Sequence, residues 1–121
     1  MTSEVLKGGL IGCGFFAVNQ MHGWQEIEGV EIVAICDRDR ARLTEIGDKF
    51  DVDARYSDAA EMLAAEKLDF VDIATTVESH RALVELAARH GLHVICQKPL
   101  AETMEDARAM NAAVADAGRV F

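Results

Sequence analysis

The residues best placed to do chemistry are glycines near the N-terminus. Residues 9–17, GLIGCGFFA, carry the spacing G-x-G-x-x-A between an apolar run and a helical pattern. This spacing is typical of a strand-to-helix turn that binds the pyrophosphate of a dinucleotide. Gly12 would allow the tight turn, Gly14 would let the backbone approach a phosphate, and the small Ala17 would let the helix lie close to the sheet.

Two further features extend this predicted site. The N–H groups of Phe15 and Phe16 would point at phosphate oxygens, at the positive end of the helix dipole. Asp37 follows a second apolar run, 23 residues after Gly14, near the separation of about 20 expected of an acid that binds the adenosine ribose. A carboxylate there favours NAD, because it would repel the 2′-phosphate of NADP. The nearby Arg38 and Arg40 leave NADP possible, since either arginine could bind a 2′-phosphate or stack on the adenine.

The elements that must position these residues alternate between strands and helices. Apolar runs predict strands over 6–11, 30–36, 70–74 and 93–96, with a short strand over 54–56. Apolar residues at helical spacing lie between or after them: Ala17, Met21, Trp24 and Ile27; Leu83, Leu86 and Ala87; and Met104, Ala107, Met110 and Val114. Thr103-x-x-Asp106 predicts a capping box for the last helix. The alternation indicates an α/β fold, a Rossmann-type doubly wound parallel sheet in a single domain over 1–121.

Composition excludes several classes of protein. The chain has 121 residues, with 12 basic and 21 acidic side chains, a net charge of −9, and no basic stripe for a nucleic acid. No apolar run approaches the roughly 20 residues of a membrane span, and the N-terminus lacks the pattern of a secretory signal. Cys13, Cys36 and Cys96 form no C-x-x-C pair, and no histidine has metal-ligand spacing, so we expect a reduced, cytoplasmic protein without a metal site.

The chain resembles the N-terminal nucleotide-binding domain of the Gfo/Idh/MocA oxidoreductases over almost its whole length. Besides the glycine turn and Asp37, the resemblance rests on residues 71–75 (VDIAT), His80 and residues 93–101 (HVICQKPLA). It implies that Lys98 is the catalytic lysine of the family's Glu-Lys-Pro motif, at the nicotinamide end of the cofactor. The residue chemistry agrees, because an ammonium past the end of a strand can stabilise a hydroxyl oxygen as it loses its proton.

The resemblance also places other residues near the nicotinamide. Thr75, Thr76 and Gln97 would contact its ribose, and His80 would line the same rim of the cleft, although a histidine at a helix start is as typical of a purely structural hydrogen bond. Two departures from the family pattern are visible. Gln97 replaces the usual Glu and removes a negative charge beside Lys98, and residues 75–79 (TTVES) replace the usual Pro-Asn ahead of the histidine.

The function implied is NAD(P)-dependent hydride transfer to or from a sugar, polyol or related small hydroxy or keto compound. In the family a C-terminal domain supplies the substrate pocket, so we expect 1–121 to bind cofactor without appreciable turnover, and full-length homo-oligomers are possible. Residues 118–121 (GRVF) predict a helix end and the first residues of another strand, which indicates a truncated domain. The alternatives are a non-catalytic nucleotide-sensing module, a methyltransferase using S-adenosylmethionine, and a purely structural α/β domain.

Overall fold

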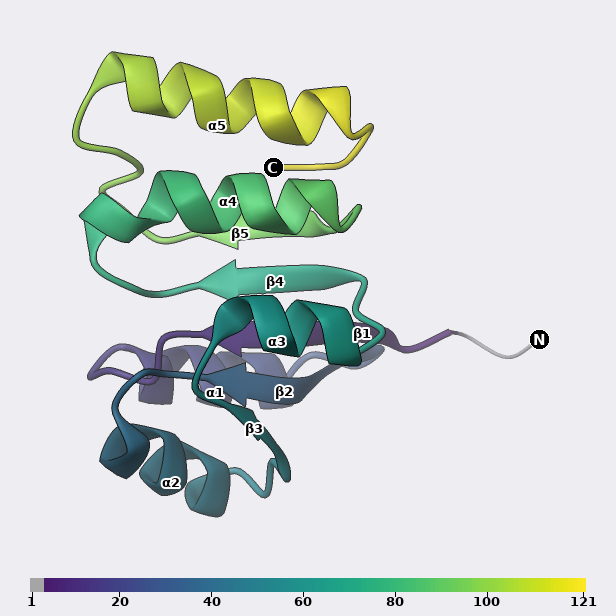
Figure 1. Ribbon diagram of the computed structural model, residues 1–121. Coiled ribbons are helices and arrows are strands. Elements are labelled where there is room, and N and C mark those ends of the chain that lie inside the picture. The colour runs from purple at the N-terminus through teal and green to yellow at the C-terminus, as the bar shows by residue number, and fades with distance from the viewer. Residues whose placement is uncertain (1–3) are drawn as a thin grey trace.

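Five parallel strands form one sheet in the computed structural model of the protein, which describes residues 4–121 (Figure 1). In chain order they are β1 (Leu6–Ile11), β2 (Val30–Cys36), β3 (Ala54–Tyr56), β4 (Phe70–Ile73) and β5 (His93–Cys96), and in the sheet they lie in the order β3-β2-β1-β4-β5. This is the predicted doubly wound α/β topology. β4 ends one residue before the predicted Ala74, because β1 beside it turns away at Gly12.

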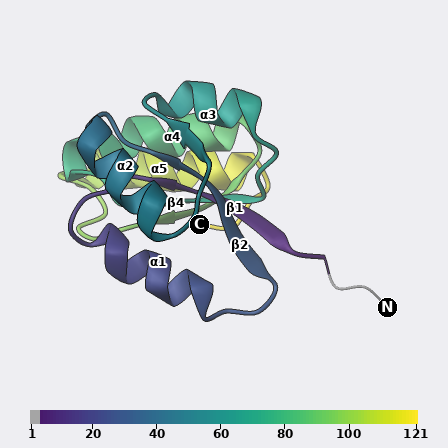
Figure 2. The same ribbon diagram turned by 90° about the horizontal axis from the view of Figure 1, so that it is seen from below.

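Helices cover both faces of this sheet. They are α1 (Ala17–Gln25), α2 (Arg40–Lys49), α3 (Ala59–Ala65), α4 (His80–Arg89), which follows a 3₁₀ turn over Val77–Ser79, and α5 (Met104–Asp116). Seen from below, α1 lies on the opposite side of the sheet from α3, α4 and α5 (Figure 2). Ile27, predicted to continue the stripe of α1, lies beyond its end and is half exposed. The sequence pattern did not single out α2 and α3, whose buried faces hold only three residues each.

Each face of the sheet has its own hydrophobic core. Under α1 and α2, the core includes Leu10, Ile35, Ala17, Met21, Leu43 and Ile46. Under α3, α4 and α5, it includes Ile11, Val71, Ile73, Met62, Val84, Met110 and Val114. Alternate strand residues point to opposite faces, so neighbours such as Leu10 and Ile11 belong to different cores. Burial on both faces explains why the strands are nearly continuous apolar runs.

The cap of α5 differs in part from the predicted reciprocal box. Thr103 Oγ1 accepts a hydrogen bond of 3.1 Å from the Asp106 N–H, as a capping residue should. The Asp106 carboxylate does not return to the Thr103 N–H but forms an ion pair of 3.0 Å with Arg81 Nη1 on α4. A charged partner on the neighbouring helix outcompetes a backbone N–H for this carboxylate.

The end of the described chain returns to the sheet. After α5 the backbone takes a positive φ of 69° at Gly118, a conformation that favours glycine. The carbonyl oxygen of Val120 then accepts a hydrogen bond of 3.0 Å from the Val94 N–H of β5. The predicted helix end and extended return are therefore present. Within residues 4–121, no helix is long and apolar enough to cross a membrane.

The carboxyl ends of the strands are held level with one another, at the left edge of the sheet in Figure 1. The residue that follows each of four neighbouring strands donates its N–H to a carbonyl on the adjacent strand. These bonds are Gly12 to Cys36 (2.8 Å), Ala74 to Ile11 (2.8 Å), Gln97 to Ile73 (3.0 Å) and Asp37 to Tyr56 (3.1 Å). The glycine turn and the predicted site residues of three other strands therefore meet at one edge, where α/β sheets bind ligands.

Candidate functional site

A cavity of about 500 Å³ opens at this carboxyl edge. Six of the residues predicted to bind a cofactor line it: Gly12, Gly14, Asp37, Arg38, Thr75 and Thr76. The structure adds further lining residues, among them Arg42, Ser57, Asp58, Ala59 and Ser79. Volumes of about 300–1,000 Å³ are usual for pockets that bind small molecules or cofactors.

The two glycines of the turn serve different purposes. Gly12 has a φ of +104°, and a Cβ there would lie only 2.6 Å from the Ala74 carbonyl oxygen, so the protein's own packing requires glycine. A Cβ on Gly14 would meet nothing closer than Arg42 Nη1, at 3.9 Å. The protein therefore has room for a side chain at Gly14, and the open space beside this backbone can admit a ligand.

The start of α1 offers an anion site. Phe16 is the N-cap, and no acidic residue lies in the first turn. Among residues 4–121, the backbone N–H groups of Phe15 and Phe16 have no hydrogen-bond acceptor. Free N–H groups at a helix N-terminus favour a phosphate. The two phenyl rings lie outside the cavity, 86% and 71% exposed, so the predicted role rests on the backbone of these residues.

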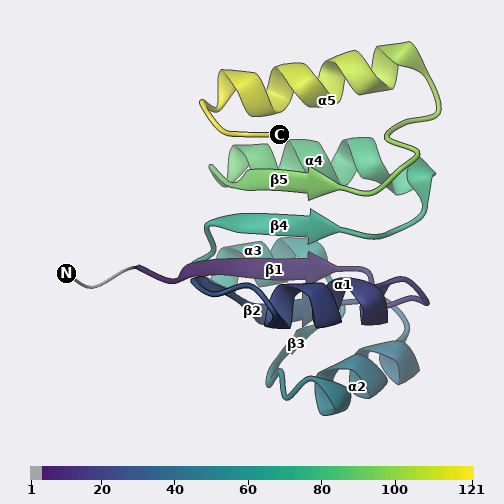
Figure 3. The ribbon, with the colours of Figure 1, turned by 180° about the vertical axis from the view of Figure 1, so that it is seen from behind.

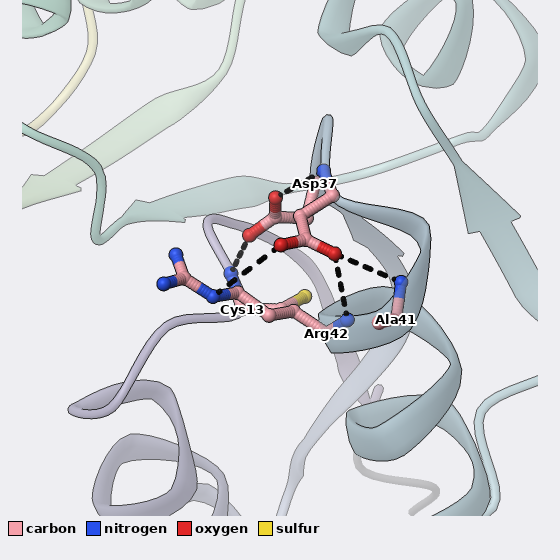
Figure 4. Close-up of polar contacts among 5 residues, drawn as sticks. Cys13, Asp37, Ala41 and Arg42 are labelled. Carbon is pink, nitrogen blue, oxygen red and sulfur yellow. Dashed lines mark hydrogen bonds and ion pairs between the residues drawn. The ribbon is translucent and has the colours of Figure 1, made fainter.

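Asp37 is oriented by two backbone donors before any ligand is considered. Its Oδ2 accepts a hydrogen bond of 2.7 Å from the Cys13 N–H in the glycine turn, and its Oδ1 accepts one of 2.7 Å from the Asp39 N–H (Figure 4). Each carboxylate oxygen keeps acceptor capacity, because a carboxylate can take about four hydrogen bonds. The carboxylate thus remains able to accept bonds from ribose hydroxyls at the cavity wall.

Arg42 is a cavity residue that sequence reasoning missed. Asp39 caps α2 by accepting hydrogen bonds from the N–H groups of Ala41 (2.9 Å) and Arg42 (3.3 Å), and its other oxygen lies 3.8 Å from Arg42 Nε (Figure 4). This contact turns the guanidinium toward Gly14. In sequence, Arg42 is an ordinary exposed residue in the first turn of a helix. Only the spacing from the capping Asp39, three residues earlier, could have indicated its direction.

The loop after β4 is held by its own hydroxyl groups and by a buried histidine. Ser79 Oγ lies 2.6 Å from Thr75 Oγ1 and 2.7 Å from the Thr76 carbonyl oxygen. His80 is only 1% exposed and does not line the cavity. Its Nε2 lies 3.1 Å from the Thr75 carbonyl oxygen and its Nδ1 lies 3.0 Å from the Leu100 carbonyl oxygen. His80 therefore links the loops that follow β4 and β5, and does not reach the cleft rim as the resemblance implied.

Gln97 and Lys98 begin the loop after β5. Gln97 is partly buried, and Lys98 and Pro99 are exposed. Neither Gln97 nor Lys98 lines the cavity, although the Gln97 N–H bond to Ile73 keeps both residues at the carboxyl edge. The structure thus brings the residues predicted to bind the pyrophosphate and the adenosine ribose together at one cavity and places Lys98 on the adjoining loop.

The three cysteines behave as buried apolar residues. Cys13 and Cys36 are buried, and Cys96 is partly buried. Burial, with a smaller contribution from the charge of Asp37, raises the pKa of the Cys13 thiol to about 12 and that of Cys36 to about 11. Such thiols carry almost no thiolate near neutral pH. In the part of the chain that the structure describes, no cluster of three metal-ligating side chains occurs.

The donors and acceptors of this cavity match the parts of a dinucleotide. The free N–H groups and the open backbone at Gly14 suit a pyrophosphate, and the pre-oriented Asp37 suits a ribose diol. One wall of the cavity, including Ala59, Leu83 and Leu86, is apolar, as a nucleotide base requires. The described residues therefore fit a dinucleotide cofactor.

Comparison with known proteins agrees with this geometry. A family model described as an oxidoreductase family with an NAD-binding Rossmann fold matches residues 6–121. The chain is 60% identical over 110 residues to a D-apiose dehydrogenase of Rhizobium rhizogenes, covering 91% of this chain and 32% of that protein. A D-apiose dehydrogenase of Paraburkholderia graminis is 59% identical over 117 residues, covering 97% of this chain and 31% of that protein.

Solved structures show the same relationship. The crystal structure of an oxidoreductase from Agrobacterium radiobacter, in complex with NAD⁺, L-tartaric acid and magnesium, superposes with a TM-score of 0.93 at 57% identity. The match covers 98% of this chain and 34% of that one, so the chain spans about a third of the length of these relatives. The glycine turn, Asp37, the parallel sheet and the family match lead to one conclusion: the chain belongs to the Gfo/Idh/MocA oxidoreductase family, of which it forms the NAD-binding Rossmann domain.

Proposed function

We propose that this domain serves a dehydrogenase that transfers a hydride between NAD(H) and a small sugar, with D-apiose or a related aldose as the substrate. The main support for this proposal is the cavity at the carboxyl edge, where two backbone N–H groups orient Asp37 and the space beside the Gly14 backbone is open. The sugar class is supported by the two D-apiose dehydrogenases at about 60% identity. The substrate would be bound jointly with a further part of the protein, because the relatives are about three times as long.

The adenosine and pyrophosphate parts of the cofactor would be held by the first half of the chain. Gly14 and the N–H groups of Phe15 and Phe16 would contact the pyrophosphate, with Gly12 making the turn that presents them. Asp37 would accept hydrogen bonds from the adenosine ribose hydroxyls. Arg38, exposed at the same wall, would lie along the adenosine.

The nicotinamide part would be held by the loops after β4 and β5. Thr75, Thr76 and Gln97 would offer hydroxyl and amide groups to the second ribose. The bound nicotinamide ring supplies the hydride acceptor or donor. Lys98 would place its ammonium against the reacting oxygen of the sugar and stabilise the negative charge that grows there as the hydroxyl proton leaves.

Cofactor choice is the direct test of this proposal. Calorimetric titration of the chain with NADH and NADPH at one fixed salt concentration should show saturable binding, with NADH the tighter ligand, because Asp37 would repel a 2′-phosphate. Asp37→Ala should weaken NADH binding by at least about tenfold, as expected when hydrogen bonds to a charged group are lost. Asp53→Ala, which removes an exposed carboxylate outside the cavity, is the matched control.

Two outcomes would count against the proposal. A folded chain that binds neither nucleotide would contradict a cofactor site. Equal binding by the wild type and the Asp37→Ala variant would contradict the role of this carboxylate. For the isolated chain, we expect no oxidation of D-apiose in the presence of NAD⁺. The relatives named for this activity are about three times as long as the matched segment, so the chain matches only about a third of such a protein.

A further inference from the structure

A carboxylate is buried against the sheet, outside the cavity. Asp72 lies on β4 and is 2% exposed. Gln20 Nε2 donates to both of its oxygens, at 2.8 and 2.9 Å, and Trp24 Nε1 donates to Oδ2 at 2.8 Å. Both donors come from α1, which lies over this face of the sheet (Figure 3). α1, which follows the glycine turn, is thereby tied to β4, the strand that leads to Thr75.

The donors around Asp72 are all neutral. Among the described residues, no lysine, arginine or histidine forms an ion pair with it. Desolvation by burial raises the pKa of the Asp72 carboxyl, and hydrogen bonds from Trp24, Gln97 and Gln20 oppose that rise. The Asp72 carboxylate is therefore surrounded by neutral groups. One of them, the amide of Gln97, comes from the loop after β5.

The strand register places Gln97 next to Asp72. Asp72 pairs with Ile95 across the β4–β5 ladder. Side chains two residues apart in a strand point the same way, and the ladder continues through the Gln97 N–H to Ile73. The side chain of Gln97 therefore projects on the same face as Asp72, one step farther along, where its amide helps to lower the pKa of the carboxyl.

Lys98 lies between two anchors as a result. On one side, the Gln97 side chain shares a face of the sheet with Asp72, and the Gln97 N–H is hydrogen-bonded to Ile73 of β4. On the other side, the Leu100 carbonyl is bonded to the buried His80. The lysine itself is exposed, so these neighbours define the position of its backbone.

We propose that Asp72 is a positioning residue that acts through Gln97 to hold the Lys98 segment at the nicotinamide end of the site, and that this contact requires an amide at position 97. The inference rests on the proposed function, because that function is what gives the Lys98 segment a role. A glutamate at position 97 would set a second carboxylate against a buried one that has no cation, and two such groups cannot both stay ionised cheaply.

Three variants test the contact: Gln97→Glu, Asp72→Asn, and the two together. An asparagine at position 72 keeps the size of the aspartate and can donate its amide hydrogens to a glutamate at position 97. Each variant is titrated with NADH and, separately, with ADP, which contains the adenosine and pyrophosphate parts but no nicotinamide. Asp53→Asn and Glu45→Gln, both exposed and outside the cavity, are the matched controls.

Gln97→Glu should weaken NADH binding by about tenfold, the size expected when a charged hydrogen bond is replaced by repulsion, and should change ADP binding less than twofold. Adding Asp72→Asn should restore most of the NADH affinity. A direct effect of the introduced glutamate on the cofactor would not be rescued this way, because Asp72 does not touch the cavity. An unrescued loss, or equal losses for NADH and ADP, would overturn the inference.

The contact is also measurable without any cofactor. Urea unfolding of the wild type, both single variants and the double variant forms a double-mutant cycle. The double variant should be more stable than the sum of the single effects predicts, whereas additive effects would overturn the inference. If the wild type bound neither NADH nor ADP, the proposed function would fail, and this cycle would still decide whether Asp72 holds Gln97.

Discussion

The Asp37 carboxylate and the Cys13 N–H are joined by a hydrogen bond of 2.7 Å, which ties the end of β2 to the glycine turn after β1. The acid that would bind the ribose and the turn that would bind the pyrophosphate are therefore parts of one rigid unit. A site built this way loses little conformational entropy when a ligand binds, because its polar groups already hold their positions.

Substitutions at the two glycines of the turn should have different effects: one at Gly12 should lower stability, and one at Gly14 should weaken cofactor binding. Gly12→Ala should lower the free energy of unfolding by about 3 kcal/mol, because it forces a positive φ on alanine and a contact of its Cβ with the Ala74 carbonyl. Gly14→Ala should change it by less than about 0.5 kcal/mol, yet weaken NADH binding at least about tenfold, since its methyl group projects into open space that the pyrophosphate would use. Urea unfolding and calorimetric titration measure the two effects. Strong NADH binding by Gly14→Ala would argue against a pyrophosphate at this turn.

His80 should matter for stability and for the nicotinamide end of the site. His80→Ala leaves the Thr75 and Leu100 carbonyls without their partner and opens a cavity, so we expect the free energy of unfolding to fall by about 3 kcal/mol. At a temperature where the variant remains folded, NADH affinity should fall more than ADP affinity, because the freed loops carry Thr75 and Lys98. The control is His90→Ala, an exposed histidine at the end of α4. Equal effects of the two variants would show that the bridge contributes nothing.

Asp72 should leave a pH signature on stability. Burial raises its pKa above the ordinary value of 3.8, so the folded protein holds the Asp72 proton more tightly than the unfolded chain does. The stabilisation that comes from the protonated carboxyl is complete below pH 3.8 and is lost as the pH rises through the raised pKa. The free energy of unfolding of the wild type, minus that of Asp72→Asn, should therefore fall over this range and then level off.

Urea unfolding at a series of pH values measures this difference. Subtracting the free energy of unfolding of the variant cancels the titration of carboxylates that both proteins share. As a control, the difference between the wild type and Asp53→Asn, which removes an exposed acid, should not change with pH. Parallel curves for the wild type and Asp72→Asn would mean that burial does not perturb this carboxyl.

Local pattern was enough to predict the strands, the glycine turn and the acid after β2. The strands are apolar runs buried on both faces, and both Gly12 and Asp37 are positioned by the strand immediately before them, so nearby residues carry the information. The family resemblance, drawn from sequence alone, is likewise confirmed by the family match.

Tertiary structure alone decided the rest, because these contacts join residues far apart in the chain. Asp72 meets Trp24 across 48 residues, and His80 meets Leu100 across 20. Sequence reasoning left His80 divided between the cleft rim and a structural hydrogen bond, and gave no role to Asp72 in an otherwise apolar strand, since no local pattern says which partner a buried polar group will find. That partner is set by strand order and helix placement, which exist only once the sheet has formed.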